Sequence, residues 1–400
     1  MTSLSGVTQD EVRRHNLARL LQILHLHGPA TRSRLGAETG LNRSTVGVLT
    51  SELADAGLVR ETTPVGRGVG RPSIVVEPVA TSAYVLAFDF RVERTVAALV
   101  GLGGTVLARR ERVHRRDSFG ERDALRHLGA LARSLTKQAP ADGVCAGIGV
   151  GVPGVVRHRD GLVRFAPNLG WVDVPLGRHL TELIAHGLPV VVGNDADFGA
   201  VAEHVRGAAV GSDNVIYLSG EVGVGGGIIL DGAPMTGSGG YGGEVGHMVV
   251  NPKGLVCRCG ARGCWETEIG EDAVLRATGL DDGEHDVLDA LAAARTGDRK
   301  ARAGLRRIGE WIGIGVANLV NLFNPEVVIF GGVLRDIFAE TEDEVRAAMT
   351  TALSAPREQV RLALPELGGD STLLGAAEQA FGALLADPLG GLARARAAAS

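Results

Sequence analysis

The chain is poor in aromatic residues, which make up 4% of its 400 residues, although 45% of the residues are apolar. Aliphatic side chains and alanine must therefore fill its cores, and the length predicts two or three compact units. Long apolar runs are also missing. No stretch approaches the roughly 20 apolar residues of a membrane span, and the first residues lack the pattern of a signal peptide. We therefore expect a cytoplasmic protein without membrane insertion.

Cysteine is scarce as well, with four residues in the chain. Cys145 lies in an apolar stretch typical of a buried strand, whereas the other three are clustered between Cys257 and Cys264. In a reducing compartment such clustering argues against a disulfide framework and favours a metal site.

An excess of positive charge is missing too, because the formal net charge is −5. The first 80 residues nevertheless hold nine Arg against seven Asp and Glu, so the negative charge lies in the remainder of the chain. The N-terminal part is therefore the part suited to meet the phosphates of nucleic acid.

Residues 1–80 predict a winged helix-turn-helix domain. Apolar residues recur there at helical spacing, and Gly28 and Gly40 supply turns. We expect helices over 10–27, 31–39 and 42–56, with Thr31 capping the second. Helix, helix, glycine-containing turn and helix is the order of a helix-turn-helix. Two short strands with a tip rich in glycine and arginine follow as the wing.

The third helix has the features of a recognition helix, because its exposed first turn offers groups that can contact base edges and phosphates. The cationic tip of the wing suits a minor groove. The predicted DNA contacts are Asn42, Arg43, Ser44, Thr45, Arg67 and Arg71. Val46, Leu49 and Leu53 are expected to pack inward. A small helical protein-binding module with a solvated loop is the alternative for this region.

From residue 81 the pattern becomes α/β. We expect the order β-β-β-α-β over residues 84–90, 94–102, 105–113, 122–138 and 144–152. A related hairpin recurs over 214–230, and this half-repeat resembles the two-lobed, actin-like (RNase H-like) fold of ATPases and sugar kinases. This kinase-like domain would span residues 81–400 and consist of two lobes. One lobe would comprise about 81–195 together with the C-terminal helix, and the other about 196–385. The tail, 393–400, is expected to fray.

The clustered cysteines carry the strongest chemical signal. With a nearby histidine they form a set of three thiolates and one imidazole, typical of a tetrahedral zinc site: His247, Cys257, Cys259 and Cys264. Four protein ligands leave no open position, so the predicted Zn²⁺ is structural. Gly260 and Gly263 allow the tight loop that such a site needs. Three reduced thiols without metal are the alternative.

The same segment resembles the signature of the ROK family of repressors, open reading frames and kinases. The matching motifs are Gly243-Glu244-Val245-Gly246-His247 and, after a spacer, Cys257-x-Cys259-Gly260-x-x-Gly263-Cys264-x-Glu266. The resemblance extends over nearly the whole chain. It implies a sugar kinase, or a sugar-responsive regulator where a DNA-binding domain is present, and an assembly of the homodimer or homotetramer kind.

The resemblance also implies a sugar site. Asn194-Asp195-Ala196 matches the family motif whose aspartate is the general base in kinases, a role that suits a carboxylate beside a sugar hydroxyl. The implied sugar contacts are Asn168, Asn194, Asp195, Glu244, His247 and Glu266. For the Asn194-Asp195 pair, an ordinary Asx turn at the end of a strand is the alternative.

The two phosphate loops depart from those of the family's kinases. The first reads Asp89-Phe90-Arg91-Val92-Glu93 where the kinases resemble Asp-x-Gly-Gly-Thr, and the second has Glu221-Val222 in place of Gly-Thr. Glu93 and Glu221 would set carboxylates against the phosphates, unless Arg91 or Arg94 offset them. We therefore expect no ATP binding and no catalytic residue in use.

These observations predict a sugar-responsive transcriptional regulator whose partners are operator DNA, a sugar effector and further copies of itself. An ATP-dependent sugar kinase of the glucokinase type with an added DNA-binding domain is the main alternative. A DNA-binding module on a mere dimerisation scaffold is the third.

Overall fold

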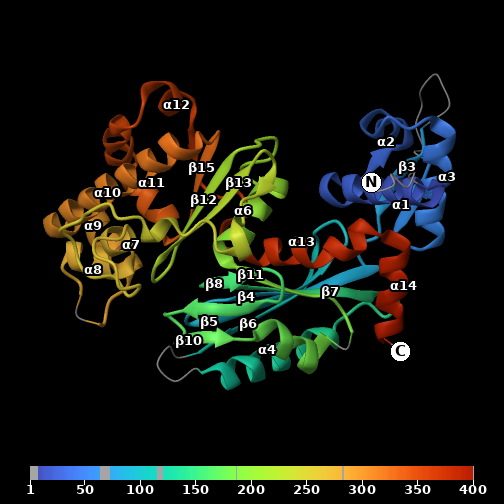
Figure 1. Cartoon of the computed structure of the whole chain (residues 1–400), viewed down its shortest axis with the longest axis horizontal. Coiled ribbons are helices and arrows are strands. Elements are labelled where there is room, and N and C mark those ends of the chain that lie inside the picture. The colour runs from blue at the N-terminus through green and yellow to red at the C-terminus, as the bar shows by residue number, and fades with distance from the viewer. Residues whose placement is uncertain (1–7, 64–72, 115–119, 186, 282, 400) are drawn as a thin grey trace, which may run out of the picture.

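The computed structural model describes residues 8–63, 73–114, 120–185, 187–281 and 283–399. A small N-terminal domain stands at one end of the molecule, and a larger body of two lobes extends away from it (Figure 1).

The N-terminal domain has the predicted order of helices. They are α1 (Gln9–His27), α2 (Arg32–Thr39) and α3 (Arg43–Asp55), with a sheet of order β1-β3-β2 formed by β1 (Ala30–Thr31), β2 (Val59–Thr62) and β3 (Val75–Pro78). Thr31 caps α2 as predicted, because its side chain accepts a hydrogen bond from the Arg34 amide. Val46, Leu49 and Leu53 are buried, which confirms the inward face of α3.

The first lobe is built on a five-stranded sheet of order β11-β7-β4-β5-β6. Its strands are β4 (Ala83–Phe90), β5 (Arg94–Gly101), β6 (Val106–Val113), β7 (Val144–Val152) and β11 (Val190–Asn194). Every residue of β4 is buried, because α4 (Glu121–Thr136) packs on one face and α13 (Ser371–Ala386) on the other. Phe88 faces the α4 side and Val85 the α13 side, as strand alternation requires.

A three-stranded sheet and a short helical segment complete the first lobe. They are β8 (Val155–Arg157), β9 (Leu162–Ala166), β10 (Trp171–Val174), α5 (Leu176–Leu180) and the π-helix η2 (Thr181–Ala185). The turn between β9 and β10 carries Asn168.

The second lobe is built on a sheet of order β14-β13-β12-β15-β16. Its strands are β12 (Val215–Gly220), β13 (Val224–Leu230), β14 (Ala233–Pro234), β15 (Val327–Gly332) and β16 (Arg361–Ala363). Its helices are α7 (Glu266–Ile269), α8 (Glu271–Thr278), α9 (Val287–Thr296), α10 (Arg299–Phe323), α11 (Val333–Ala348) and α12 (Ser354–Gln359). Trp265 is fully buried against α10, where Gly315 leaves room for its ring.

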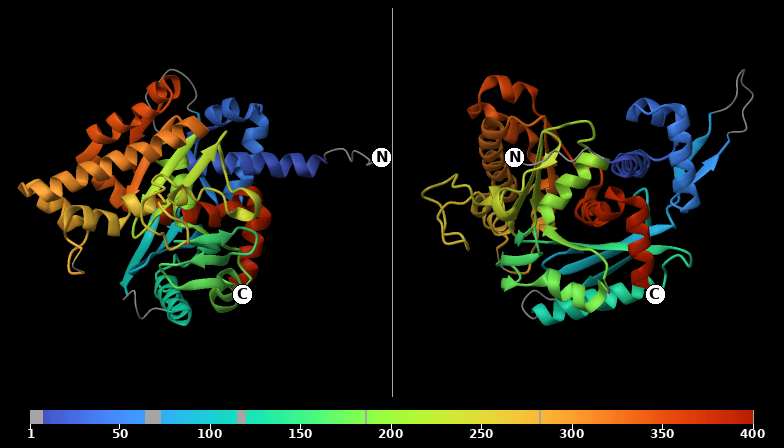
Figure 2. Two further views of the ribbon diagram at one scale, coloured as in Figure 1. Left: turned by 60° about the vertical axis from the view of Figure 1, so that its left-hand side comes forward. Right: turned by 45° about the vertical axis from the view of Figure 1, so that its right-hand side comes forward.

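Three helices join the parts of the molecule. Helix α6 (Asp195–Arg206) follows β11, while α13 and α14 (Pro388–Ala399) lie between the first-lobe sheet and the N-terminal domain, as the views in Figures 1 and 2 agree. The expectation that the tail frays is wrong, because Leu392 and Ala395 of α14 are buried. Among the described helices, none has the length and hydropathy to cross a bilayer.

Candidate functional site

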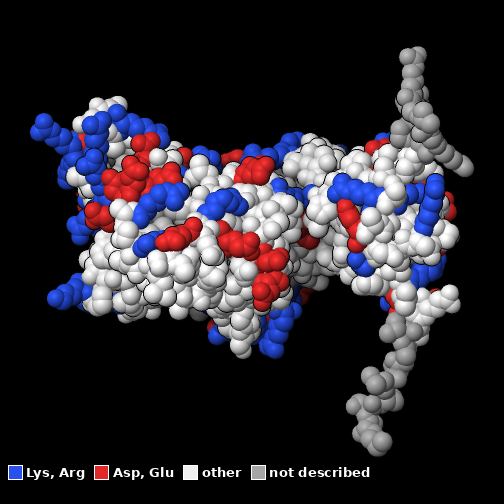
Figure 3. Space-filling view, turned by 90° about the horizontal axis from the view of Figure 1, so that it is seen from above, with Lys and Arg blue, Asp and Glu red and all other residues white. Residues whose placement is uncertain are grey.

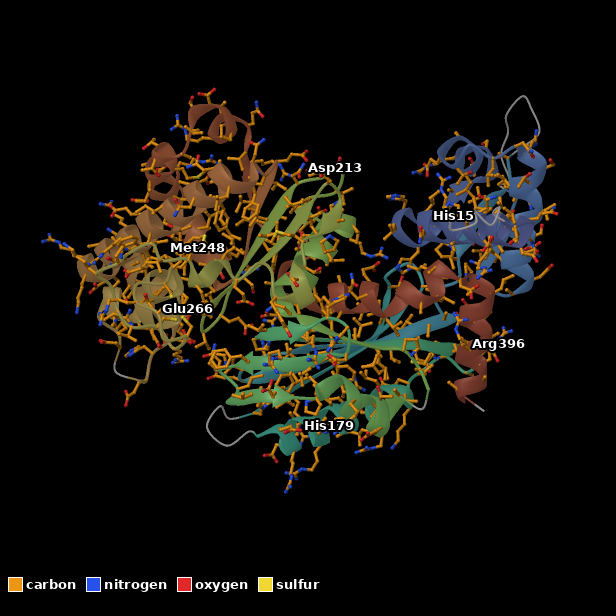
Figure 4. The ribbon with its side chains drawn as sticks, viewed as in Figure 1. His15, His179, Asp213, Met248, Glu266 and Arg396 are labelled. Carbon is orange, nitrogen blue, oxygen red and sulfur yellow. The ribbon has the colours of Figure 1, made fainter. Side chains whose placement is uncertain are left out.

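A cavity of about 210 Å³ lies where the two lobes meet. It is lined by all six residues predicted to contact sugar: Asn168, Asn194, Asp195, Glu244, His247 and Glu266. They come from the β9–β10 turn and the start of α6 on one side, and from the 3₁₀ turn Val245–His247 with its flank and α7 on the other. Figure 4 places Glu266 in the second lobe, far from His15 of the N-terminal domain.

Asn194 and Asp195 have different roles in this cavity. The Asn194 side-chain oxygen accepts hydrogen bonds from the backbone amides of Ala196 and Asp197, at 2.8 and 3.1 Å, so Asn194 is the N-cap of α6. Its amide nitrogen donates to the Gly154 carbonyl at 3.0 Å. Asn194 therefore forms the turn that the alternative predicted. Asp195 Oδ1 also accepts from the Ala196 amide at 2.9 Å, and its Oδ2 atom has no hydrogen-bond partner among the described residues.

Acidic groups crowd this cavity. Burial raises the pKa of Asp195 well above its ordinary value, and the charges of Glu221 and Asp89 raise it further. Burial also raises the pKa of Glu244, although His247 opposes that shift. Carboxyl groups in such a site can both accept hydrogen bonds from hydroxyls and, when protonated, donate them. These groups, together with Arg258 and Arg276 in the same lining, can form hydrogen bonds with a polyhydroxylated ligand.

Arg258, which the sequence analysis did not single out, also lines the cavity. It follows Cys257 directly, and its guanidinium donates a hydrogen bond to the Asn168 side-chain oxygen across the two lobes. A second contact, to Asp272, measures 3.5 Å. The metal-site loop thus holds the first-lobe turn in place beside the cavity.

The four predicted metal ligands come together. The ligand atoms of His247, Cys257, Cys259 and Cys264 all lie within 4.8 Å of one another. The Cys259 and Cys264 sulfurs are 3.6 Å apart, and the Cys257 sulfur is 3.7 Å from His247 Nδ1. Zn–S bonds of about 2.3 Å in a tetrahedron require ligand separations of about 3.7 Å, so this donor set fits zinc.

His247 connects the metal cluster to the cavity, and two glycines shape the loop that carries the cysteines. Because His247 presents Nδ1 to the cysteines, its Nε2 atom remains for the cavity that the ring lines. The loop also depends on Gly263, whose φ is +75° and where an added Cβ would lie 1.6 Å from the Asn251 carbonyl oxygen. Gly260 likewise has a positive φ, as the tight loop predicted.

Arg91 lies between the two segments that correspond to the kinases' phosphate loops. Its Nε donates to Asp89 at 2.6 Å, its Nη2 donates to the Gly369 carbonyl at 2.7 Å, and its Nη1 lies 3.3 Å from Glu221. Asp89 lies in the first-lobe strand β4, one residue before its end, and Glu221 follows the second-lobe strand β12. These contacts, here named the Arg91 clasp, therefore connect the lobes.

Glu93 and Arg94 do not take part in the Arg91 clasp. The Glu93 side chain is exposed and does not line the cavity. Of the two possible offsetting cations, Arg91 pairs with the buried carboxylates, while Arg94 lies 3.7 Å from Glu111. Burial raises the pKa of Glu221 to about 7, although the charge of Arg91 opposes that shift.

The candidate DNA-binding surface is the start of α3. Asn42, Arg43 and Ser44 are exposed and Thr45 is half-buried. Asn42 caps the helix, since its side-chain oxygen accepts from the Thr45 amide at 2.9 Å and from the Ser44 hydroxyl at 2.7 Å. Arg43 forms no ion pair with any described residue. The predicted wing contacts Arg67 and Arg71 lie outside the described residues.

Charge on the N-terminal domain is mixed. The face turned toward the viewer in Figure 3 carries several basic side chains together with acidic ones. Arg13 pairs with Glu52 at 2.8 Å and Arg32 with Glu61 at 2.6 Å, so part of the positive charge is already neutralised within the domain. Arg43, at the start of α3, is exposed.

Known proteins resemble the chain over nearly its full length. The ROK family profile matches residues 85–381. The xylose repressor of Bacillus subtilis is 31% identical over 363 residues, which cover 87% of this chain and 88% of that one. The crystal structure of a ROK family transcriptional regulator, a homologue of the E. coli MLC protein, superposes with a TM-score of 0.78 at 26% identity, over 97% and 98% of the two chains.

Relatives that are kinases match only part of the chain. A glucokinase of Streptomyces coelicolor is 34% identical over 253 residues, 58% of this chain and 79% of that one. The ROK family glucokinase from Streptomyces griseus, solved with glucose and AMPPNP, has a TM-score of 0.65 at 29% identity and covers 74% of this chain and 99% of its own. The family match and the full-length relatives together identify the chain as a member of the ROK family.

Proposed function

We propose that the chain is a sugar-responsive transcriptional repressor whose kinase-like body binds a sugar and does not phosphorylate it. One observation carries the proposal: a single chain joins a helix-turn-helix domain, whose third helix has an exposed first turn, to a polar cavity beside which Arg91 pairs with Asp89 and Glu221. The full-length likeness to a xylose repressor supports the same assignment. Regulation takes place in the cytoplasm, where operator DNA is found.

The effector is a sugar or phosphosugar held by Asp195, Glu244, Glu266 and Asn168, with His247 contributing Nε2. The carboxyl groups accept from sugar hydroxyls, and a buried carboxylate–hydroxyl pair contributes about 1.5–3 kcal/mol. Zn²⁺ bound by His247, Cys257, Cys259 and Cys264 is structural: it fixes the His247 ring and the loop that carries Arg258. D-xylose is the first probe to use, because of the named relatives.

DNA binding is assigned to the first turn of α3, through Arg43, Ser44 and Thr45, with Arg67 and Arg71 of the wing. Asn42 contributes mainly as the cap that orders this turn. A homodimer or homotetramer would present two such helices to a roughly palindromic operator. Sugar in the cavity lowers operator affinity and so relieves repression.

The absence of turnover follows from the Arg91 clasp. A nucleotide phosphate in this part of the cleft would have to displace Arg91 from two carboxylates and a carbonyl. It would then meet the unneutralised carboxylate of Glu221, which stands where the family's kinases have glycine. The alternative, an ATP-dependent sugar kinase, keeps some support from the partial glucokinase relatives. It predicts ADP release that depends on sugar and Mg²⁺.

Fluorescence anisotropy with a duplex selected by the wild-type protein from a random pool tests the regulator proposal. D-xylose, D-glucose and N-acetyl-D-glucosamine are added in turn. We expect one of them to weaken duplex binding by tenfold or more, and the Glu244→Ala variant to bind the duplex but ignore the sugar. Operator binding that no sugar alters would overturn the proposal.

A further inference from the structure

A buried polar network connects the N-terminal domain to the body of the molecule. It consists of His25 near the end of α1, Gly103 in the β5–β6 turn, Arg206 at the end of α6 and Glu378 in α13. Arg206 donates from Nε to Glu378 at 2.7 Å, from Nη1 to the Gly103 carbonyl at 3.2 Å and from Nη2 to the His25 carbonyl at 3.1 Å. One guanidinium therefore holds three separate segments.

The His25 ring closes this network. Its Nδ1 accepts from the Gly103 amide at 2.9 Å, which leaves the proton on Nε2, and Nε2 donates to Glu378 at 3.0 Å. The His25 side chain is fully buried. A polar network so buried and so completely paired defines one relative position of its parts, whereas apolar packing alone is non-directional.

Gly104 shows how closely Arg206 is seated. Its φ is +81°, and an added Cβ would lie 2.6–2.9 Å from three guanidinium atoms of Arg206. Around the network, apolar residues of α1, among them Leu20 and Leu24, share one buried cluster with Phe381 of α13. The N-terminal domain is therefore packed onto the body at this point.

Helix α6 leads from the network directly to the sugar cavity. It begins at Asp195, which lines the cavity, and ends at Arg206, so its 12 residues span about 18 Å. Helix α13 runs beside it. The Thr372 hydroxyl donates to the Asp195 carbonyl at 3.0 Å, and Gly375 is so close to α6 that a Cβ would lie 1.8 Å from the Phe198 carbonyl oxygen.

A buried carboxylate braces the same two helices. Glu203 of α6 accepts from the Ser371 hydroxyl at 2.7 Å and from the amides of Glu366 and Leu367 at 3.1 Å. Because α6 and α13 are locked together at Asp195 and again at Glu203, a shift of α6 at the cavity must reach Arg206 and Glu378.

From this arrangement we infer that Arg206 is the residue through which occupancy of the sugar cavity alters the position of the DNA-binding domain. This inference rests on the proposed function, because it assigns to Arg206 the link between sugar binding and DNA binding. Arg206 contacts neither cavity nor DNA surface: it is a positioning residue. Helix α6 carries the displacement, and the pairing of Arg206 with Glu378 and with the His25 carbonyl transmits it to α1.

The test compares full-length wild type with Arg206→Met, using the selected duplex and the sugars D-xylose, D-glucose and N-acetyl-D-glucosamine. The coupling factor is the ratio of duplex Kd with saturating sugar to duplex Kd without sugar. We expect a factor of 10–100 for wild type, within the usual range for allosteric coupling. For Arg206→Met we expect a factor within about twofold of 1, with sugar Kd within threefold of wild type.

Arg361→Met is the matched control, because Arg361 also donates to a backbone carbonyl just beyond α6, that of Ala208 at 2.7 Å, yet lies outside the network. It should keep the wild-type coupling factor. Glu378→Gln, which keeps the shape of the side chain and removes its charge, is the second variant if Arg206→Met does not fold. Its coupling factor should also fall toward 1.

The outcomes separate the two proposals. If wild type responds to a sugar and the network variant that folds responds equally well, the inference is wrong and the proposed function stands. If no sugar changes the duplex affinity of wild type, the proposed function fails and the inference fails with it. Loss of coupling with sugar and duplex binding both retained supports the inference, because a merely structural role would weaken binding itself.

Discussion

Removal of Arg91 should destabilise the protein in a manner that depends on pH. In Arg91→Ala, Asp89 and Glu221 lose their shared cation while Asp89 stays almost fully buried. Stranding one member of a buried ion pair costs about 3–5 kcal/mol. At pH 8 we expect Arg91→Ala to lower the free energy of unfolding by about 3 kcal/mol, the lower end of this range, since Glu221 keeps some access to water. For a body of this size that amounts to a melting temperature lower by roughly 6 °C.

The pH dependence follows from the direction of the pKa shifts. Burial raises the folded-state pKa of Asp89 and brings that of Glu221 to about 7, and loss of Arg91 raises both further. Groups with raised pKa values contribute stability below their unfolded-state values and lose it as pH rises through the folded ones. The penalty of Arg91→Ala should therefore grow between pH 5 and pH 8. At pH 5 we expect about 1 kcal/mol, from the lost hydrogen bond to Gly369.

Thermal unfolding followed by circular dichroism at pH 5 and pH 8 measures both values. The control is Arg346→Ala, which removes an exposed pair with Glu342 and should change stability by less than about 0.5 kcal/mol at either pH. The double variant Asp89→Asn/Arg91→Ala should recover part of the loss at pH 8. A penalty that is equal at the two pH values, or absent at pH 8, would refute the clasp as a buried charge cluster.

Three further predictions concern the sites themselves. Asp195→Asn and Glu244→Ala should each lower sugar affinity by tenfold or more, because each loses hydrogen bonds to the sugar worth about 1.5–3 kcal/mol. Thermal-shift titration with the sugar measures this loss, and an unchanged stabilisation by sugar would contradict the assigned cavity. Cys259→Ser should lower the zinc content from about one ion per chain to well below one and abolish the sugar response. Mass spectrometry of metals measures the zinc content, and a wild-type protein without zinc would overturn the metal assignment. Arg43→Ala should weaken duplex binding by about tenfold with sugar Kd unchanged, and equal duplex binding would remove α3 from the interface.

Features defined by neighbours in the sequence were predictable. The three N-terminal helices, the hairpin from β4 to β6 and the metal cluster depend on local periodicity, turn glycines and short ligand spacing. Asn168 is separated from the metal loop by many residues, and it was found only through the resemblance to the family. The position of such a residue depends on how the lobes close, which local patterns do not encode.

The clasp and the interdomain network show what the sequence could not reveal. Arg91 was weighed as a possible offset to two carboxylates, but its direction depends on Glu221 and Gly369, which come from distant parts of the chain. Glu93, two positions further on, is exposed and does not line the cavity. His25 and Glu378 are 353 positions apart and look unremarkable in sequence. The Ala-rich tail forms a helix that is held against the body, because Leu392 and Ala395 are buried. Arg396, beside the N-terminal domain in Figure 4, donates to the Ala56 carbonyl at 3.3 Å.

The central claim is that the cleft binds a sugar and no longer uses ATP. Isothermal titration of D-xylose, D-glucose and N-acetyl-D-glucosamine into the zinc-containing protein, with and without Mg·ATP, tests it most directly. The account predicts saturable binding of one sugar, with the same Kd in the presence of Mg·ATP and no continuing heat of turnover. Heat that appears only with ATP and persists until the sugar is consumed would contradict it, because the phosphate side of the cleft would then function despite Arg91.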